Sequence, residues 1–177
     1  SFQQTRAWHS YGAFDTTAPG NIKAARAAGV SKVDVYLFPC PSKGASEQVH
    51  ELVSSLQSSG ISTSGMTVWM DIETNPSPGC GWSSDLSSNC QYVASLVSAA
   101  NSLGVGSGVY ISQYMQSRIV GDSCTSTSSA PLWYAEYNGD GSCSGFKPFG
   151  GWSSPTMHQW DDNGSKCGVS YDQDVDC

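Results

Sequence analysis

The sequence predicts an α/β fold: an irregular TIM-like (β/α) barrel with fewer than eight helices, stabilised by disulfides. Apolar, β-rich runs alternate with segments of helical periodicity, which indicates βα units and a largely parallel sheet. Only about seven strands can be counted, with no helix between the last two, whereas a complete eight-stranded barrel takes about 250 residues. Seven cysteines in 177 residues, with no Cys-x-x-Cys pair, indicate structural disulfides.

The first third of the chain alternates strand and helix. Residues 2–8 are strand-like, and residues 21–28 have helical spacing before a glycine. Residues 32–38 form the next apolar β-rich run. From Ala45 onward, apolar residues recur at helical spacing until Gly60. We therefore expect the order strand, helix, strand, helix.

The remainder of the chain continues this alternation. The segment Met66–Ile72 is almost uninterrupted in apolar residues, as expected for a strand buried on both faces. Asp85 precedes an amphipathic helix for which Gly104 is a suitable stop. Further strands are expected over residues 108–112, 132–137, 156–160 and 169–172. No long linker interrupts the series, so we expect residues 1–177 to form one domain.

The charge balance limits the partners of the protein. Eight basic and 15 acidic residues give a net charge of −7, which opposes nucleic acid or an anionic membrane as a partner. No stretch approaches the roughly 18 apolar residues of a membrane span, and the first residues do not form a signal peptide. We expect a processed, soluble and monomeric protein, either secreted and extracellular or held in a lysosome or phagosome. No cofactor is implied.

The odd number of cysteines leaves at least one thiol without a partner inside the sequence. Cys80 with Cys90, and Cys124 with Cys143, are plausible local bridges around the loops at one end of the sheet. Spacing alone does not determine the connectivity, so these pairings stay open.

Two acidic residues at the end of the central strand are candidate catalytic groups. Asp71 and Glu73 are two positions apart, so their side chains share one face of the strand, about 6.6 Å apart at Cα. They lie at the carboxyl end, where barrel enzymes have their active sites. Mutual repulsion raises the pKa of one acid and gives a proton donor beside an ionised partner, as glycosidic bond cleavage requires. From spacing alone, an exposed acidic pair of no function is an equal alternative.

Aromatic residues in the predicted strands favour the catalytic interpretation, because aromatic planes at the mouth of a barrel stack on sugar rings. Each of them alone is more simply explained as core packing. The candidate sugar-binding residues are Tyr36, Trp69, Tyr110, Trp133, Tyr137 and Trp160.

Four segments carry a resemblance to a known family: residues 33–40 (VDVYLFPC), 69–73 (WMDIE), 131–135 (PLWYA) and 148–152 (PFGGW). Together they resemble the eukaryotic branch of glycoside hydrolase family 25, the Chalaropsis-type lysozymes, and the similarity runs from Arg6 to the C-terminus.

The resemblance implies the roles of three residues. Glu73 matches the proton donor of the family, Asp71 its charged partner, and Asp172 an acid of the last strand that supports the site. It implies a muramidase that hydrolyses the β-1,4 bond between N-acetylmuramic acid and N-acetylglucosamine in bacterial peptidoglycan, without a metal.

The chain departs from the family at its start. A first strand carrying another active-site aspartate precedes, in the family, the segment that matches residues 2–8, and it is absent from this sequence. We expect an opening between the first and last strands and a natural protein with a longer N-terminus. Cys40 is then a candidate for the unpaired thiol.

Two other classes of function remain open. One is a glycan-binding protein that descends from a lysozyme and has lost catalysis. The other is a metal-dependent phosphodiesterase on a barrel that binds a divalent cation through acidic side chains. Its candidate ligands are Asp71, Glu73, Asp172 and Asp174.

Overall fold

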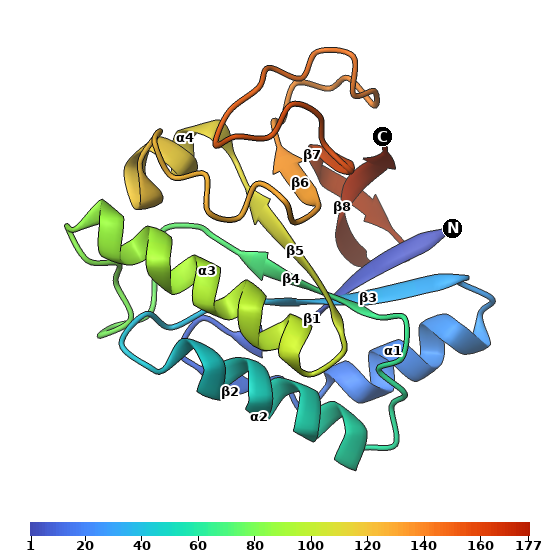
Figure 1. The fold of residues 1–177 in the computed structure, drawn as a ribbon. Coiled ribbons are helices and arrows are strands. Elements are labelled where there is room, and N and C mark those ends of the chain that lie inside the picture. The colour runs from blue at the N-terminus through green and yellow to red at the C-terminus, as the bar shows by residue number, and fades with distance from the viewer.

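The computed structural model describes all 177 residues and contains one mixed sheet of eight strands (Figure 1). The elements are β1 (Phe2–His9), β2 (Ala13–Phe14), α1 (Ala18–Ala27), β3 (Lys32–Leu37), α2 (Ala45–Ser58), β4 (Thr67–Asp71), α3 (Leu86–Ser102), β5 (Gly106–Ile111), α4 (Gln113–Met115), the π-helical turn η1 (Gln116–Val120), β6 (Leu132–Ala135), β7 (Met157–Lys166) and β8 (Val169–Asp176). None of the helices is long and apolar enough to cross a membrane.

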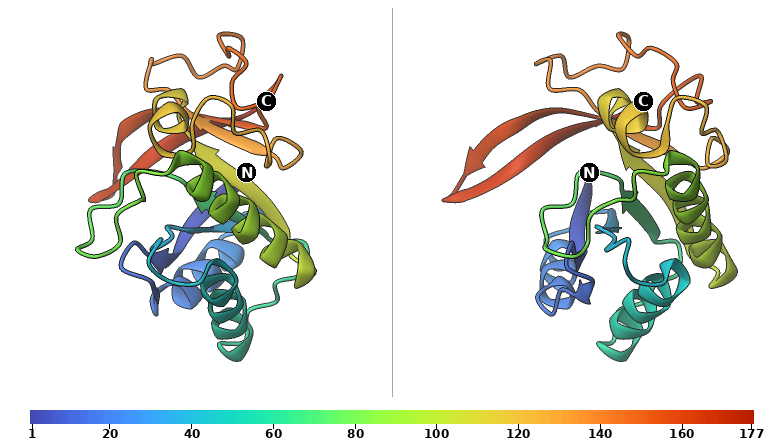
Figure 2. Two further views of the ribbon diagram at one scale, coloured as in Figure 1. Left: turned by 60° about the vertical axis from the view of Figure 1, so that its left-hand side comes forward. Right: turned by 90° about the vertical axis from the view of Figure 1, so that its left-hand side faces the viewer.

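The strands lie in the order β2-β1-β3-β4-β5-β6-β7-β8. From β1 to β7 the neighbours pair in parallel, while β2 and β8 each pair antiparallel with one neighbour. The sheet curls without closing, because β1 and β8 are not paired with each other. The β7–β8 hairpin extends away from the rest of the molecule (Figure 2). The expected opening is present as a groove of about 850 Å³ between β1 and β8.

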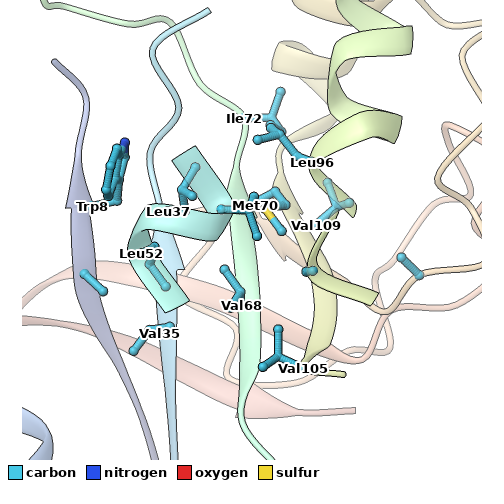
Figure 3. Packing of buried hydrophobic residues seen from close by; sticks show 14 of the residues in the cluster. Trp8, Val35, Leu37, Leu52, Val68, Met70, Ile72, Leu96, Val105 and Val109 are labelled. Carbon is cyan, nitrogen blue, oxygen red and sulfur yellow. The ribbon is translucent and has the colours of Figure 1, made fainter. Parts of the chain in front are cut away.

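The hydrophobic core lies between the outer face of the sheet and the helices. Alternate residues of β4, such as Val68 and Met70, point to this face and meet Leu52 of α2 and Leu96 of α3 in one cluster of 32 buried residues (Figure 3). Residues between them in the strand face the opposite side. The strand period therefore separates the packing face of β4 from the face that carries the acids.

The helix and strand pattern predicted from the sequence is confirmed, with differences at the boundaries. Helix α1 starts at Ala18, earlier than expected, because Pro19 fits the first turn of a helix. Strand β8 continues to Asp176 through its antiparallel ladder with β7. The two-residue β2, the short α4 and η1 were not expected. They have too few residues for a side-chain period to be recognised. Helix α4 begins after Ser112, whose hydroxyl accepts a hydrogen bond from the Met115 backbone N–H.

The disulfides correct the expected local pairings. The bridges join Cys40 to Cys80, Cys90 to Cys124 and Cys143 to Cys177. Cys40 is therefore paired, and the free thiol is the exposed Cys167 near the tip of the β7–β8 hairpin. The local pairings were wrong because each bridge joins segments 34 or 40 residues apart that belong to or follow neighbouring elements of the fold. Cys40 follows β3, for example, and its partner lies in the loop after β4.

Candidate active site

Three carboxyl groups meet at a small cavity on the concave face of the sheet. Asp71 ends β4, Glu73 lies two residues further on, and Asp172 comes from β8. The cavity has a volume of about 140 Å³. Its remaining lining residues are Tyr36, Tyr110, Trp133, Tyr137 and Gln159. The structure therefore brings together all three acids that the sequence singled out.

Asp71 is the most enclosed of the acids. It is 6% exposed, and its Oδ1 atom has no hydrogen-bond partner in the protein. Burial raises the pKa of Asp71 well above its ordinary value, and the nearby charge of Glu73 raises it further. A buried carboxyl oxygen without a donor is an unfavourable site for a negative charge. Loss of a proton therefore costs Asp71 more free energy than it costs an exposed carboxyl group.

Glu73 is half-buried and more accessible. Its backbone carbonyl accepts a hydrogen bond of 2.7 Å from the indole of Trp82, which fixes the chain just beyond β4. Burial raises the pKa of Glu73, and the negative charge of Asp172 raises it further. Because each ionised carboxyl group disfavours ionisation of its neighbour, the acids retain a proton at a pH where exposed carboxyl groups have lost theirs.

Gln159 on β7 links the walls of the cavity and was missed by the sequence analysis. Its Oε1 atom accepts hydrogen bonds from the hydroxyls of Tyr110 at 2.6 Å and Tyr137 at 2.9 Å. Its amide group donates to Asp172 Oδ2 at 3.2 Å. The only sequence signal was its position two residues after the inward-facing Met157. Burial raises the pKa of Tyr110, so this side chain stays a neutral hydrogen-bond donor.

The predicted aromatic residues occupy three different places. Four of them line the cavity: Tyr36, Tyr110, Trp133 and Tyr137. Trp69 lies beneath the acids, 1% exposed, with its ring edge-on to Trp133 at 5.8 Å. Trp160 lies instead in the groove between β1 and β8. The groove and the cavity share residues from four strands, Tyr36, Trp133, Gln159 and Asp172, so the two spaces are adjacent.

Asp174 supports the wall of this groove. Its Oδ1 atom accepts a hydrogen bond of 2.8 Å from the Trp133 indole. Burial raises the pKa of Asp174 to about 6, and the charge of Asp172 contributes to that increase. No three His, Cys, Asp or Glu side chains are arranged to hold a metal ion, and this includes the four acids considered as ligands above.

A curled, mostly parallel sheet with paired acids and aromatic residues at the carboxyl ends of its strands is the arrangement of a glycoside hydrolase. Residues 1–160 match the family model described as lysozyme-like protein 1. The chain belongs to the glycoside hydrolase family 25 lysozymes.

Individual relatives agree with this assignment. The chain is 39% identical to lysozyme-like protein 5 of Caenorhabditis elegans over 97% of its own length and 79% of that protein. It is 39% identical to probable GH family 25 lysozyme 2 of Dictyostelium discoideum, covering 97% of this chain and 77% of the relative.

Solved structures share the fold. The muramidase from Trichobolus zukalii superposes with a TM-score of 0.78 at 18% identity, over 99% of this chain and 82% of that one. The lysozyme from Streptomyces coelicolor gives a TM-score of 0.78 at 16% identity, over 99% and 81% of the two chains.

Proposed function

We propose that this protein is a muramidase that hydrolyses the β-1,4 bond between N-acetylmuramic acid and N-acetylglucosamine in bacterial peptidoglycan. The observation that carries this proposal is the meeting of Asp71, Glu73 and Asp172 at one cavity walled by aromatic side chains. Family membership supports the same chemistry. The activity needs no cofactor.

Glu73 is the general acid in this proposal. It is the more accessible member of the pair, and its raised pKa keeps a proton available for the departing glycosidic oxygen. Asp71 acts as the charged partner. Positive charge that develops on the sugar ring beside Asp71 favours ionised Asp71, so the proton of the pair starts on Glu73 and passes to the departing oxygen as the bond breaks. Water then adds to the sugar and returns a proton to Glu73. Asp172 supports Glu73 through its negative charge.

The aromatic side chains supply the binding surface. Tyr36 and Trp133 line both the catalytic cavity and the larger groove, so they can contact sugars on either side of the cleaved bond. Trp160 extends this surface along the groove. Trp69 acts indirectly by supporting Trp133 from below.

The test compares wild type with Glu73→Gln on a suspension of bacterial cell walls. Wild type should clear the suspension, and Glu73→Gln should lose that activity while binding the walls equally well. Glu51→Gln, at an exposed acid of α2 outside the cavity, is the matched control and should clear like wild type. Binding without clearance by the wild type would instead show a glycan-binding protein with no catalysis.

We further propose that the protein works in an oxidising compartment outside the cytosol. Three disulfides support this proposal, because such bonds persist in secreted and lysosomal surroundings. Reduction of the three bridges with excess dithiothreitol should abolish clearance, and full activity of the reduced protein would contradict the proposal.

A further inference from the structure

A second cavity opens beside the catalytic one, at the ends of β5 and β6. We call it the rim pocket; it has a volume of about 240 Å³, and the lining residues used below are Ser112, Tyr134, Glu136, Phe146, Lys147 and Phe149. It lies where α4 meets the long loop between β6 and β7 (Figure 1).

Residues at the ends of two strands line both cavities. Tyr110 of β5 lines the catalytic cavity, and Ser112, which directly follows β5, lines the rim pocket. After β6, Tyr137 lines the catalytic cavity and Glu136 the rim pocket. Glu136 and Tyr137 are consecutive residues, so the two cavities are neighbours at the carboxyl ends of β5 and β6 although Tyr134 and Trp133 face opposite sides of the sheet. The rim pocket is therefore placed to contact a group attached to the glycan near the cleaved bond.

The rim pocket combines an apolar wall with two opposite charges. Phe146 packs edge-on to Tyr134 with ring centroids at 5.0 Å and lies 5.7 Å from the ring of Phe149. Glu136 and Lys147 are both exposed, and neither forms an ion pair with another residue. Lys147 is thus free to meet an anionic group of a ligand.

Tyr134 provides a third polar group. The residue is 4% exposed, and its hydroxyl has no hydrogen-bond partner in the protein. Buried hydroxyls are rarely left without a partner. A polar group of a ligand in the adjacent pocket would supply one.

We propose that the rim pocket binds the short peptide attached to the lactyl group of N-acetylmuramic acid. A carboxylate of this peptide pairs with Lys147, a peptide N–H donates to Glu136, and the methyl group of an alanyl residue packs on Phe146 and Phe149. The volume is below the roughly 300–1,000 Å³ of pockets that enclose larger ligands, so one or two amino-acid residues fit. The choice of peptide over a further sugar follows from the charges. N-acetylglucosamine carries none, and the lactyl carboxyl of peptide-bearing N-acetylmuramic acid is consumed in the amide bond to the peptide. This inference rests on the proposed function.

The kinetic test uses glycan strands that carry their peptides and the same strands after an amidase has removed them. Lys147→Gln should lower kcat/KM roughly two- to fivefold on the peptide-bearing strands, as expected for an exposed charge pair, and leave hydrolysis of the peptide-free strands unchanged. Lys166→Gln, on the distant hairpin, is the matched control and should match wild type on both. An equal loss on both substrates would show that the pocket binds sugar, and no loss on either would also overturn the inference.

A binding measurement separates this inference from the proposed catalysis. Wild type should bind N-acetylmuramoyl-L-alanyl-D-glutamate more tightly than N-acetylmuramic acid, with shifts in the NMR signals of Phe146 and Phe149. Tyr134→Phe breaks no bond within the protein and should weaken this binding roughly two- to tenfold. Equal affinity for both ligands would refute the peptide site. Peptide binding without hydrolysis of any glycan would refute the muramidase instead.

Discussion

Gly108 on β5 lies directly opposite Trp69 on β4, and Gly108→Ala tests how Trp69 supports the acids above it. An added Cβ would lie 2.4 Å from Cε3 and Cζ3 of Trp69, whereas carbon atoms in contact prefer about 3.5–4.0 Å. Trp69 is 1% exposed and is held by Trp133 at 5.8 Å, so its ring has little room to move. The substitution must displace the ring or separate the strands.

The expected cost is about 3 kcal/mol of unfolding free energy. Overpacking a well-packed site costs roughly 1–3 kcal/mol. Weakening the hydrogen bond of 3.4 Å from the Trp69 indole to Asp34 Oδ2 adds up to about 1 kcal/mol. For a chain of this length the midpoint of thermal unfolding should fall by roughly 6–12 °C. Cell-wall clearance should also fall, since Trp69 and Asp71 share one face of β4.

A double-mutant cycle in urea, followed by circular dichroism, measures the contact itself. In a Trp69→Phe background the smaller ring leaves room, so Gly108→Ala should cost at least about 1.5 kcal/mol less than in wild type. Gly20→Ala in α1 is the control: nothing lies within 4 Å of its added Cβ, so it should stabilise by about 0.5–1 kcal/mol. Unchanged stability of Gly108→Ala, or additive costs in the cycle, would refute this reasoning.

Three further predictions concern the disulfides and the acids. Replacing Cys90 and Cys124, which are 34 residues apart, by Ser should lower the unfolding free energy by roughly 4 kcal/mol in urea; a loss below 1 kcal/mol would contradict the assigned bridge. The pKa of Asp174 is raised from 3.8 to about 6 in the folded protein. The contribution of this shift to the free energy of unfolding is therefore complete below about pH 4 and is lost as the pH rises through about 6. Asp174→Asn should therefore be as stable as wild type near pH 4 and more stable by on the order of 2 kcal/mol near pH 7. A variant that unfolds at a lower temperature than wild type at pH 7 would refute the reasoning that burial destabilises ionised Asp174. Because the charge of Asp172 raises the pKa of Glu73, Asp172→Asn should shift the alkaline limb of the pH dependence of kcat/KM to lower pH, and an unmoved limb would show that the two acids do not interact.

The part of the site that could be predicted from sequence is the part that lies within one short segment of the chain. Asp71 and Glu73 could be paired because the strand period and the carboxyl end of β4 are both visible in residues 66–73. Asp172 required the family resemblance, since its strand lies nearly a hundred residues further along the chain. Gln159 carried no chemical signal, because a neutral amide becomes important only through its three hydrogen bonds in the folded site.

The disulfides show the limit of local reasoning about the fold. The interval between two cysteines says nothing about which elements are neighbours in the fold. Strand β8 returns antiparallel along β7 and so brings Cys177 to the loop that holds Cys143. The alternation of strands and helices is different. It follows from the side-chain periods within each segment and could be predicted before the topology was known.

The most direct test of the muramidase identifies the sugar at the new chain ends. Purified peptidoglycan is digested with wild type or Glu73→Gln, reduced with borohydride, and analysed by mass spectrometry. The account predicts that wild type produces reduced N-acetylmuramic acid ends and that Glu73→Gln produces none above the undigested background. Reduced N-acetylglucosamine ends, or equal product from the Glu73→Gln variant, would contradict it.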